Sequence, residues 1–323
     1  MNGKSLAQRA GRWAFDNAYL LLTLMAFFWA GNQVLGRAVA GHVPPVMLSF
    51  LRWTLATLLL LPFASPYLRQ DWPVMRAHWK LLAFLGIIGG GAFNTLQYIG
   101  LNYTSALNAL VLNSTGPVVI ALSCFLIFGD RLTPIQVLGT LISTAGVLVV
   151  VAHGSFESLL GLHLNWGDLL TLLAMSTTGV YTACLRLRPP IHWLSFLFAL
   201  FLASSLFNVP WVVLEAALGA RPELTLFAVS AVLYVAIFPS IMSYLCFTRG
   251  VELIGGVRAG VFMHLIPLFG ALMAIALLGE PLLASHVTGF ALIIAGVVLT
   301  NRKLAPPQGQ AMVPQNQSPG KSA

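Results

Sequence analysis

The chain has little charge. Only 8% of its 323 residues are Asp, Glu, Lys or Arg, whereas 58% are apolar. A soluble globular domain carries about 25% charged residues, so these charges are too few to cover a water-soluble particle of this size. Despite a net charge of +8, no block of basic residues forms a patch for a nucleic acid. The composition therefore indicates an integral membrane protein.

Cysteine is scarce as well. The three cysteines are too few for a disulfide framework, and their spacing is not that of metal ligands. We therefore expect neither a metal nor another cofactor.

Acidic side chains are missing from the middle of every long apolar run. The nine Asp and Glu residues all fall between these runs or at their ends. A proton or sodium exchanger gated by a buried carboxylate needs such an acid inside the membrane. If the chain moves a solute, this absence favours facilitated exchange down the gradient of the solute over carboxylate-driven coupling.

Long apolar runs are what the chain does contain. A helix needs about 20 mostly apolar residues to cross the hydrocarbon of a bilayer. Ten runs meet this requirement: 18–40, 44–64, 80–101, 105–128, 134–152, 167–187, 192–214, 225–247, 258–278 and 282–300. The sequence therefore predicts an all-α, polytopic membrane protein with ten transmembrane helices.

Lysine and arginine are unevenly distributed between the two sides that these spans define. With the N-terminus in the cytoplasm, 14 of the 17 cations fall on the inner side, Arg37 and Arg221 fall outside, and Arg52 lies within the second span. Cytoplasmic loops carry the excess of cations, which predicts a multi-pass membrane protein with both termini cytoplasmic. A retained first helix is favoured over a cleaved signal peptide because its apolar run is long and contains Asn32 and Gln33.

The two halves of the chain are similar in sequence. A shift of 150 gives 13 identities without a gap over the 48 positions 100–147, among them Pro117 with Pro267, and a shift of 146 pairs 48–50 with 194–196. Each half has five spans, and because five is odd the second copy enters the membrane from the opposite face. Such inverted repeats, with a binding site near the midplane between them, are typical of secondary transporters.

These observations predict the organisation of the whole chain. It comprises a cytoplasmic N-terminal segment (1–17), a first five-helix repeat (18–153), an extracytoplasmic linker (154–166), a second five-helix repeat (167–303) and a disordered cytoplasmic tail (304–323).

Several short motifs resemble those of one transporter family. They are WAGN at 29–32, FNTLQY at 93–98, GDRLTP at 129–134, AGV at 145–147 and LGEPL at 278–282. As a set they resemble the repeat of the EamA-type transporters in the drug/metabolite transporter superfamily, and the resemblance extends over 18–303. It implies a ten-helix bacterial inner-membrane carrier that exports amino acids or related small metabolites. It also implies a central cavity lined by helices 1, 3, 4, 6, 8 and 9.

Polar side chains within the spans are the candidate contacts for a solute, because polar groups in a bilayer face the bundle interior or a wet cavity. The candidates are Asn32, Asn94, Gln97, Ser114, Tyr181, Tyr244 and His264. Asn94 and Gln97 share a helix face and offer two amides to the carboxylate or ammonium of a zwitterion. Hydrogen bonding between helices is the alternative role for these amides. The shift of 150 pairs Asn94 with Tyr244.

The same shift pairs Ser114 with His264, so these residues are expected at pseudo-symmetric points around one axis. Pro117 and Pro267 each follow the polar residue by three positions and are predicted to break the helix, leaving a backbone carbonyl about one turn earlier without its donor. Such a break can offer backbone groups to a ligand. A simple proline kink is the alternative.

Two residues that can carry a positive charge lie well inside spans. His264 is the one histidine well inside a span and is the candidate for proton coupling, with a neutral hydrogen-bonding role as the alternative. Arg52 lies about two turns below the outer surface. Its guanidinium is expected to snorkel outward or to pair with carbonyls at a helix end. Contact with an anionic group of the solute is the second possibility.

The sequence thus predicts a carrier of a small-molecule substrate in the lipid bilayer, and not an enzyme. An intramembrane enzyme that acts on a lipid or small metabolite is the main alternative, but neither an HExxH nor a GxSxG motif occurs. A receptor or assembly scaffold would have larger loops between the spans. The oligomeric state is not predicted.

Overall fold

The computed structural model describes residues 13–39, 42–104, 106–152, 154–155, 157, 165–223, 225–278 and 282–302. Within these ranges the regular structure is helical, with no β-strand. The segment 1–12, most of the predicted linker and the predicted tail lie outside the described residues.

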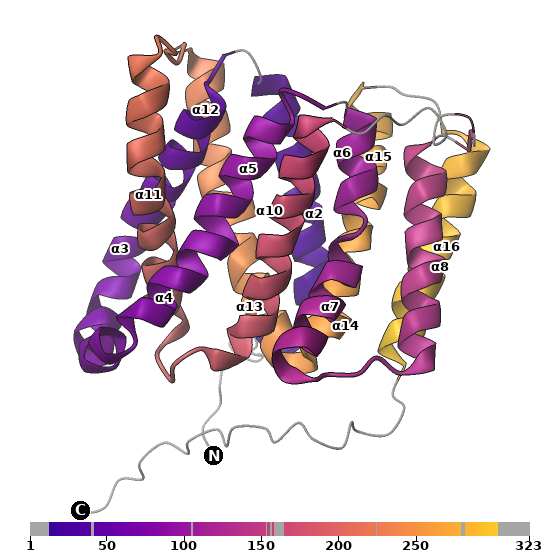
Figure 1. The fold of residues 1–323 in the computed structure, drawn as a ribbon, viewed down its shortest axis with the longest axis horizontal. Helices are drawn as coiled ribbons and strands as arrows, with labels where there is room; N and C mark the ends of the chain where they lie inside the picture. The colour runs from indigo at the N-terminus through magenta and orange to yellow at the C-terminus, as the bar shows by residue number, and fades with distance from the viewer. Residues whose placement is uncertain are drawn as a thin grey trace, which may run out of the picture.

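Ten segments of the described chain are long and apolar enough to cross a membrane, and we number them spans 1 to 10. Spans 1 to 5 are α2 (Ala18–Val39), α3 (Pro45–Ala77), α4 (Trp79–Gly86) with η1 (Ile87–Ala92) and α5 (Phe93–Gly100), α6 (Ala106–Asn113) with α7 (Gly116–Phe128), and α8 (Pro134–Val151). Spans 6 to 10 are α10 (Trp166–Cys184) with η2 (Leu185–Leu187), α11 (Trp193–Ala217), α12 (Leu226–Val235) with η3 (Ala236–Met242) and α13 (Ser243–Ile254), α14 (Gly256–Val261) with η4 (Phe262–His264) and α15 (Leu265–Leu278), and α16 (Ala284–Asn301). They run side by side in Figure 1, and this confirms the ten predicted spans.

Span 2 is longer than its apolar run. The sequence predicts 44–64, whereas α3 continues for 33 residues to Ala77. Its last part carries polar side chains, among them Arg69 and Asp71. Hydropathy measures the apolar part of a helix and not its full length, so the sequence could not place this end.

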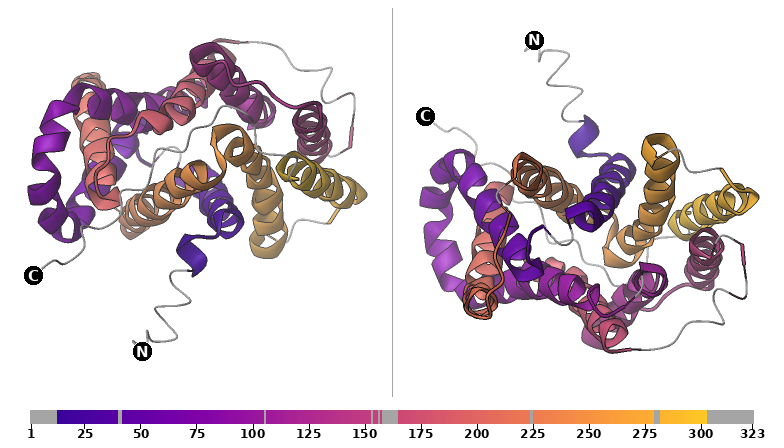
Figure 2. Two further views of the ribbon diagram at one scale, coloured as in Figure 1. Left: turned by 90° about the horizontal axis from the view of Figure 1, so that it is seen from below. Right: turned by 90° about the horizontal axis from the view of Figure 1, so that it is seen from above.

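The last spans of the two halves, α8 and α16, pack together and stand at one end of the bundle in Figure 2. A Cβ on Gly139 would lie 2.8 Å from the carbonyl oxygen of Gly296, and a Cβ on Gly146 would lie 2.8 Å from that of Gly289. The shift of 150 makes Gly289 the counterpart of Gly139 and Gly296 the counterpart of Gly146. Gly139 therefore packs against the counterpart of Gly146, and Gly146 packs against the counterpart of Gly139. This exchange is expected for two antiparallel helices related by a twofold axis. The two five-helix repeats are inverted, as predicted.

Spans 2 and 7 are joined by two carboxylates. Each lies near the end of one helix and accepts hydrogen bonds from backbone N–H groups at the start of the other. Near the end of α11, Glu215 accepts hydrogen bonds from the backbone N–H groups of Val46 (3.1 Å) and Met47 (2.8 Å) at the start of α3. Near the end of α3, Asp71 accepts one from the backbone N–H of His192, the residue before α11 (2.9 Å). First-turn N–H groups lack partners within their helix, and the helix dipole favours an anion beside them. The two contacts are reciprocal, as expected for halves related by a pseudo-twofold axis.

We expect Glu215→Ala to lower the free energy of unfolding by about 1–2 kcal/mol, because two N–H groups lose their acceptor. Glu223→Ala is the matched control at the same end of the bundle. Glu223 pairs with His42 at an exposed site, where an ion pair contributes about 0–1 kcal/mol. Thermal unfolding of the purified variants in detergent measures the difference, and equal losses would contradict this assignment.

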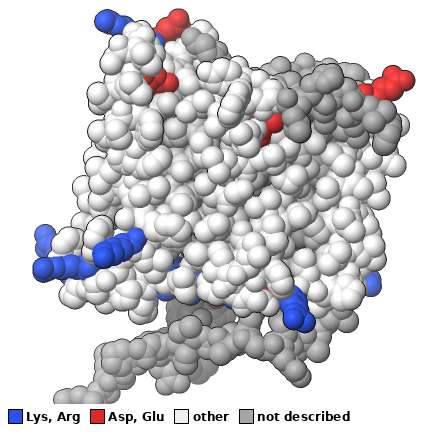
Figure 3. Space-filling model, in the orientation of Figure 1, with Lys and Arg blue, Asp and Glu red and all other residues white. Residues whose placement is uncertain are grey.

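Charge distinguishes the two ends of the bundle. Figure 3 shows Lys and Arg mainly along its lower rim, the end at which α2 begins and α16 finishes. We call this the basic end. Its described cations include Arg69, Arg76, Lys80, Arg131, Arg186, Arg188, Arg249 and Arg302. Ion pairs at this end link Arg186 with Asp130, Arg188 with Glu252 and Arg249 with Asp16, and within α13 Arg249 also pairs with Glu252.

Candidate functional site

Arg52 lies inside the bundle, about two helical turns from the start of α3, and only 1% of its surface is exposed. The outward snorkelling expected from the sequence is therefore wrong. Depth along a helix can be counted in residues, but the direction of a side chain depends on how the helix packs against its neighbours. The guanidinium does bond a backbone carbonyl, since Nη2 donates to the oxygen of Pro239 at 3.0 Å, but this carbonyl lies within the π-helical segment Ala236–Met242 and not at a helix end as expected.

The remaining hydrogen bonds of the guanidinium go to neutral oxygen atoms on spans 1, 3 and 8. Nη1 donates to Asn32 Oδ1 (3.3 Å), Asn94 Oδ1 (3.0 Å) and Tyr98 Oη (3.3 Å), and Nε donates to Ser240 Oγ (2.6 Å). We call these five side chains the Arg52 cluster.

The positive charge of the cluster is not balanced. Among the described residues, no acidic side chain forms an ion pair with Arg52. A cation that reaches the centre of a membrane costs about 2.5–3.5 kcal/mol, and the neutral acceptors around Arg52 distribute its charge without cancelling it. At the shift of 146, Arg52 corresponds to Phe198, so the first half alone supplies a cation at this point. The cluster is therefore suited to receive an anionic group.

Two π-helical segments lie at equivalent positions of the halves. They are Ile87–Ala92 in span 3 and Ala236–Met242 in span 8, and the shift of 150 places 87–92 on 237–242. A π-helical turn changes the pairing of backbone groups and is frequent at functional sites. Each half thus interrupts its regular helix where the two halves meet.

The same carbonyl of each π-helix accepts a hydrogen bond from a side chain of the site. The oxygen of Pro239 accepts from Arg52 and from Trp29 Nε1 (3.0 Å). The oxygen of its counterpart, Gly89, accepts from the hydroxyl of Tyr244 (2.5 Å). The breaks in regular helix therefore bring backbone acceptors into the site.

Tyr244 is the centre of a group of aromatic rings beside the cluster. Its ring centroid lies near those of Trp53 (5.3 Å), Phe201 (5.9 Å), Trp29 (6.0 Å) and Tyr181 (6.3 Å). These residues come from spans 1, 2, 6 and 7, so both halves contribute. The Arg52 guanidinium carbon lies 4.8 Å from the centroid of the Trp53 ring. Aromatic faces of this kind can hold a cation or an apolar group of a bound molecule.

Gln97 offers unused hydrogen-bonding capacity on α5. Only 7% of its surface is exposed, yet neither its amide oxygen nor its amide nitrogen has a partner among the described residues. Trp53 Nε1 is also buried without an acceptor there. Leaving such a group unbonded costs about 1–3 kcal/mol, so these atoms are available to a ligand. Gln97 follows Asn94 by three residues and lies on the same side of the helix.

The structure thus brings together five of the residues that the sequence singled out, namely Arg52, Asn32, Asn94, Tyr181 and Tyr244. It adds the side chains of Ser240 and Trp53, which the sequence did not indicate. A sequence signal for Ser240 does exist. The shift of 150 aligns the glycine run Gly89, Gly90, Gly91 with the segment that contains Pro239 and Ser240, so both repeats have helix-interrupting residues at the same point. Helix-interrupting residues at matching positions of two repeats are a pointer to a transporter's binding site.

Ser114 and His264 form a different contact. His264 Nε2 donates to the backbone carbonyl of Ser114 (2.9 Å), and Nδ1 is hydrogen-bonded to Ser143 Oγ (2.7 Å). Because 114 and 264 are counterparts, their contact lies on the pseudo-twofold axis. The Ser114 hydroxyl donates to the carbonyl of Val111 (2.6 Å). Within the described chain, no hydrogen bond links this contact to Arg52, and His264 joins spans 4, 5 and 9.

Both proline residues follow an interruption of their helix. In span 4, α6 ends at Asn113 and α7 begins at Gly116, immediately before Pro117. In span 9, the short 3₁₀ segment Phe262–His264 precedes the helix that contains Pro267. The Ser114 carbonyl that His264 binds belongs to the first of these interruptions.

Comparison with known proteins gives a consistent result. Residues 16–152 and 165–302 each match the EamA-like transporter family. An uncharacterized transporter of Bacillus subtilis is 27% identical over 293 residues, which cover 87% of this chain and 92% of that protein. An uncharacterized transporter of Archaeoglobus fulgidus is 28% identical over 295 residues, which cover 89% and 98%. A solved crystal structure with 19% sequence identity shares the fold, with a TM-score of 0.66 over 88% of this chain and 96% of that one.

Proposed function

This chain belongs to the EamA-like transporter family, and we propose that it exports amino acids or related small metabolites that carry a carboxylate. The observation that supports this substrate class is the buried Arg52, whose hydrogen bonds all go to neutral oxygen atoms. A carboxylate presents two oxygen atoms to the planar guanidinium fork and balances its charge.

The other polar atoms of the site suit the rest of such a molecule. The free amide of Gln97 can accept a hydrogen bond from an ammonium group. The rings around Tyr244 offer their faces to the same ammonium or to an apolar side chain. The site therefore has features that fit both ends of a zwitterion.

Alternating access is supported by the origin of the site residues. Asn32, Arg52, Asn94 and Tyr98 belong to the first half, whereas Ser240 and the carbonyl of Pro239 belong to the second. A movement of one half against the other would open such an interfacial site to one side of the membrane at a time. We place the basic end in the cytoplasm of the inner membrane, because cytoplasmic loops carry the excess of cations.

We further propose that transport is facilitated and follows the gradient of the solute. The nine acidic residues lie at span ends or between spans, so no carboxylate is placed to carry a coupling proton. His264 is the second candidate for proton coupling, but both of its ring nitrogens are engaged in bonds that join three spans. A structural role accounts for these bonds.

Uptake into proteoliposomes tests the proposal. The panel contains neutral amino acids, monocarboxylates without an amine and monoamines without a carboxylate. We expect uptake of carboxylate-bearing compounds, at a rate that a transmembrane pH gradient leaves unchanged in wild type and in His264→Asn. Uptake confined to the monoamines would refute the substrate class. Acceleration by the gradient that His264→Asn abolishes would instead establish proton coupling.

A further inference from the structure

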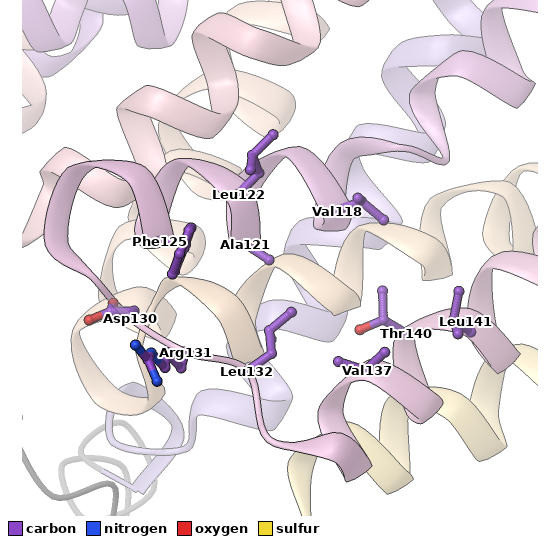
Figure 4. Close-up of a pocket in the computed structure, with 10 residues that line it drawn as sticks. All are labelled: Val118, Ala121, Leu122, Phe125, Asp130, Arg131, Leu132, Val137, Thr140 and Leu141. Carbon is purple, nitrogen blue, oxygen red and sulfur yellow. The ribbon is translucent and has the colours of Figure 1, made fainter.

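A groove of about 420 Å³ lies between α7 and α8, away from the Arg52 cluster. Figure 4 shows the residues that line it, with Leu132 pointing between the two helices and with Asp130 and Arg131 at the end where the connecting loop runs. Most of the lining is apolar. A hollow of this size is within the range of about 300–1,000 Å³ typical of small-molecule sites.

The groove opens to the outer surface of the bundle. The exposed fractions of Val118, Leu122 and Phe125 on α7 are 47%, 52% and 47%, and Val137 and Leu141 on α8 are 41% and 59% exposed. Spans 4 and 5 cross the membrane, so these side chains face the hydrocarbon of the bilayer. The molecule best suited to this groove is therefore a lipid with an acyl chain.

The rim of the groove carries an unpaired cation. Arg131 is exposed in the loop between α7 and α8 at the basic end, and among the described residues no acidic side chain pairs with it. Its neighbour Asp130 is already bonded to Arg186. A guanidinium at the membrane surface attracts the phosphate of an anionic lipid, particularly on the side where basic residues are concentrated.

We propose that this groove binds one anionic phospholipid of the leaflet at the basic end, with its phosphate on Arg131 and one acyl chain along Leu132 and Val137. The site belongs to one leaflet only. In the second half, the shift of 150 aligns Pro281 with Arg131, so the sequence supplies no cation at the matching position.

The lipid would fill a weakly packed part of the molecule. Thr140 lines the groove, and its carbonyl accepts a hydrogen bond from Ser143 Oγ (3.0 Å), the hydroxyl that is bonded to His264. Because α8 packs mainly on α16, an acyl chain between α7 and α8 supports the attachment of this helix pair to the rest of the bundle. Bound lipid is therefore expected to stabilise the protein.

Native mass spectrometry of the delipidated, full-length protein tests the proposal with phosphatidylglycerol and phosphatidylcholine of identical acyl chains. Wild type should bind one phosphatidylglycerol in preference to phosphatidylcholine, with a rise in melting temperature. Arg131→Gln should weaken phosphatidylglycerol binding about fivefold, the effect of one surface cation. Arg69→Gln, which removes another exposed cation of the same end, should leave it unchanged.

A second variant tests the groove without altering charge. Val137 faces the lipid, and in Val137→Trp the larger side chain should fill the groove between α7 and α8. The variant should therefore bind both phosphatidylglycerol and phosphatidylcholine less well than wild type. The proposal is overturned if Arg131→Gln binds phosphatidylglycerol as tightly as wild type, or if wild type does not distinguish the two lipids. The proposal is also overturned if wild type has the mass of a dimer and Val137→Trp has the mass of a monomer. That result would show that a second copy of the chain, and not a lipid, occupies the groove.

Discussion

Arg52→Gln is expected to abolish transport of carboxylate-bearing solutes while the protein remains folded. Loss of one partner of a buried, hydrogen-bonded charge pair costs about 2–5 kcal/mol, which corresponds to at least about 30-fold weaker binding. Glutamine keeps an N–H donor for the acceptor oxygen of Asn94 or Ser240 but removes the positive charge. Solute binding followed by the rise in melting temperature, together with proteoliposome uptake, measures the effect.

The melting temperature of the solute-free protein distinguishes this role from a structural one. A buried cation without an anion destabilises the empty site, so Arg52→Gln should leave that temperature unchanged or raise it, and the increase caused by solute should disappear. Arg69→Gln, at an exposed position of the same helix, serves as the control and should retain transport. Transport by Arg52→Gln within twofold of wild type, or a large loss of stability without solute, would show that the guanidinium acts only as a link between helices.

Gly146→Ala is expected to separate α8 from α16 and to lower stability by about 1–3 kcal/mol, the usual cost of overpacking. The new Cβ would lie 2.7 Å from the backbone nitrogen of Ile293 and 2.8 Å from the carbonyl oxygen of Gly289. Both are backbone atoms, so no side chain can rotate away and the two helices must move apart. Gly146→Leu should have a larger effect, with loss of folded protein.

Gly270→Ala provides the matched control in a helix. A Cβ at this position meets no heavy atom within 4 Å, and alanine is favoured over glycine in a helix interior by about 0.5–1 kcal/mol. Thermal unfolding should therefore give opposite shifts for the two alanine variants. Shifts of the same sign would mean that the crossing of α8 and α16 is not tightly packed.

The sequence predicts the fold well, because the physical requirements of a bilayer are visible in it. Apolar length defines ten spans, and an odd number of spans in each repeat requires inversion. The antiparallel approach of Gly139 to Gly296 follows from the same repeat. Helix length beyond the apolar run, as in the 33-residue α3, is not encoded in hydropathy and could not be predicted in this way.

The site is only partly predictable. Asn94 and Tyr244 are identified because polar groups are rare within spans and because the repeat pairs them. Arg52 has the right depth, but the side of the helix on which it lies is set by packing, so its expected outward direction is wrong. The carbonyls of Gly89 and Pro239 leave no hydropathy signal, since backbone acceptors become available only through the π-helical turns.

The replacement of Arg52 by Phe198 at the matching point of the other half has a consequence for the direction of the cargo. A chain with arginine at this position in both halves would have two positive charges related by the pseudo-twofold axis, and a carboxylate could bind to either of them. With one arginine, a carboxylate-bearing solute bound as proposed would always point its acid group toward Arg52. Under the proposed function, the pseudo-twofold axis relates the two halves of the site, whereas the single arginine gives the bound solute one fixed orientation.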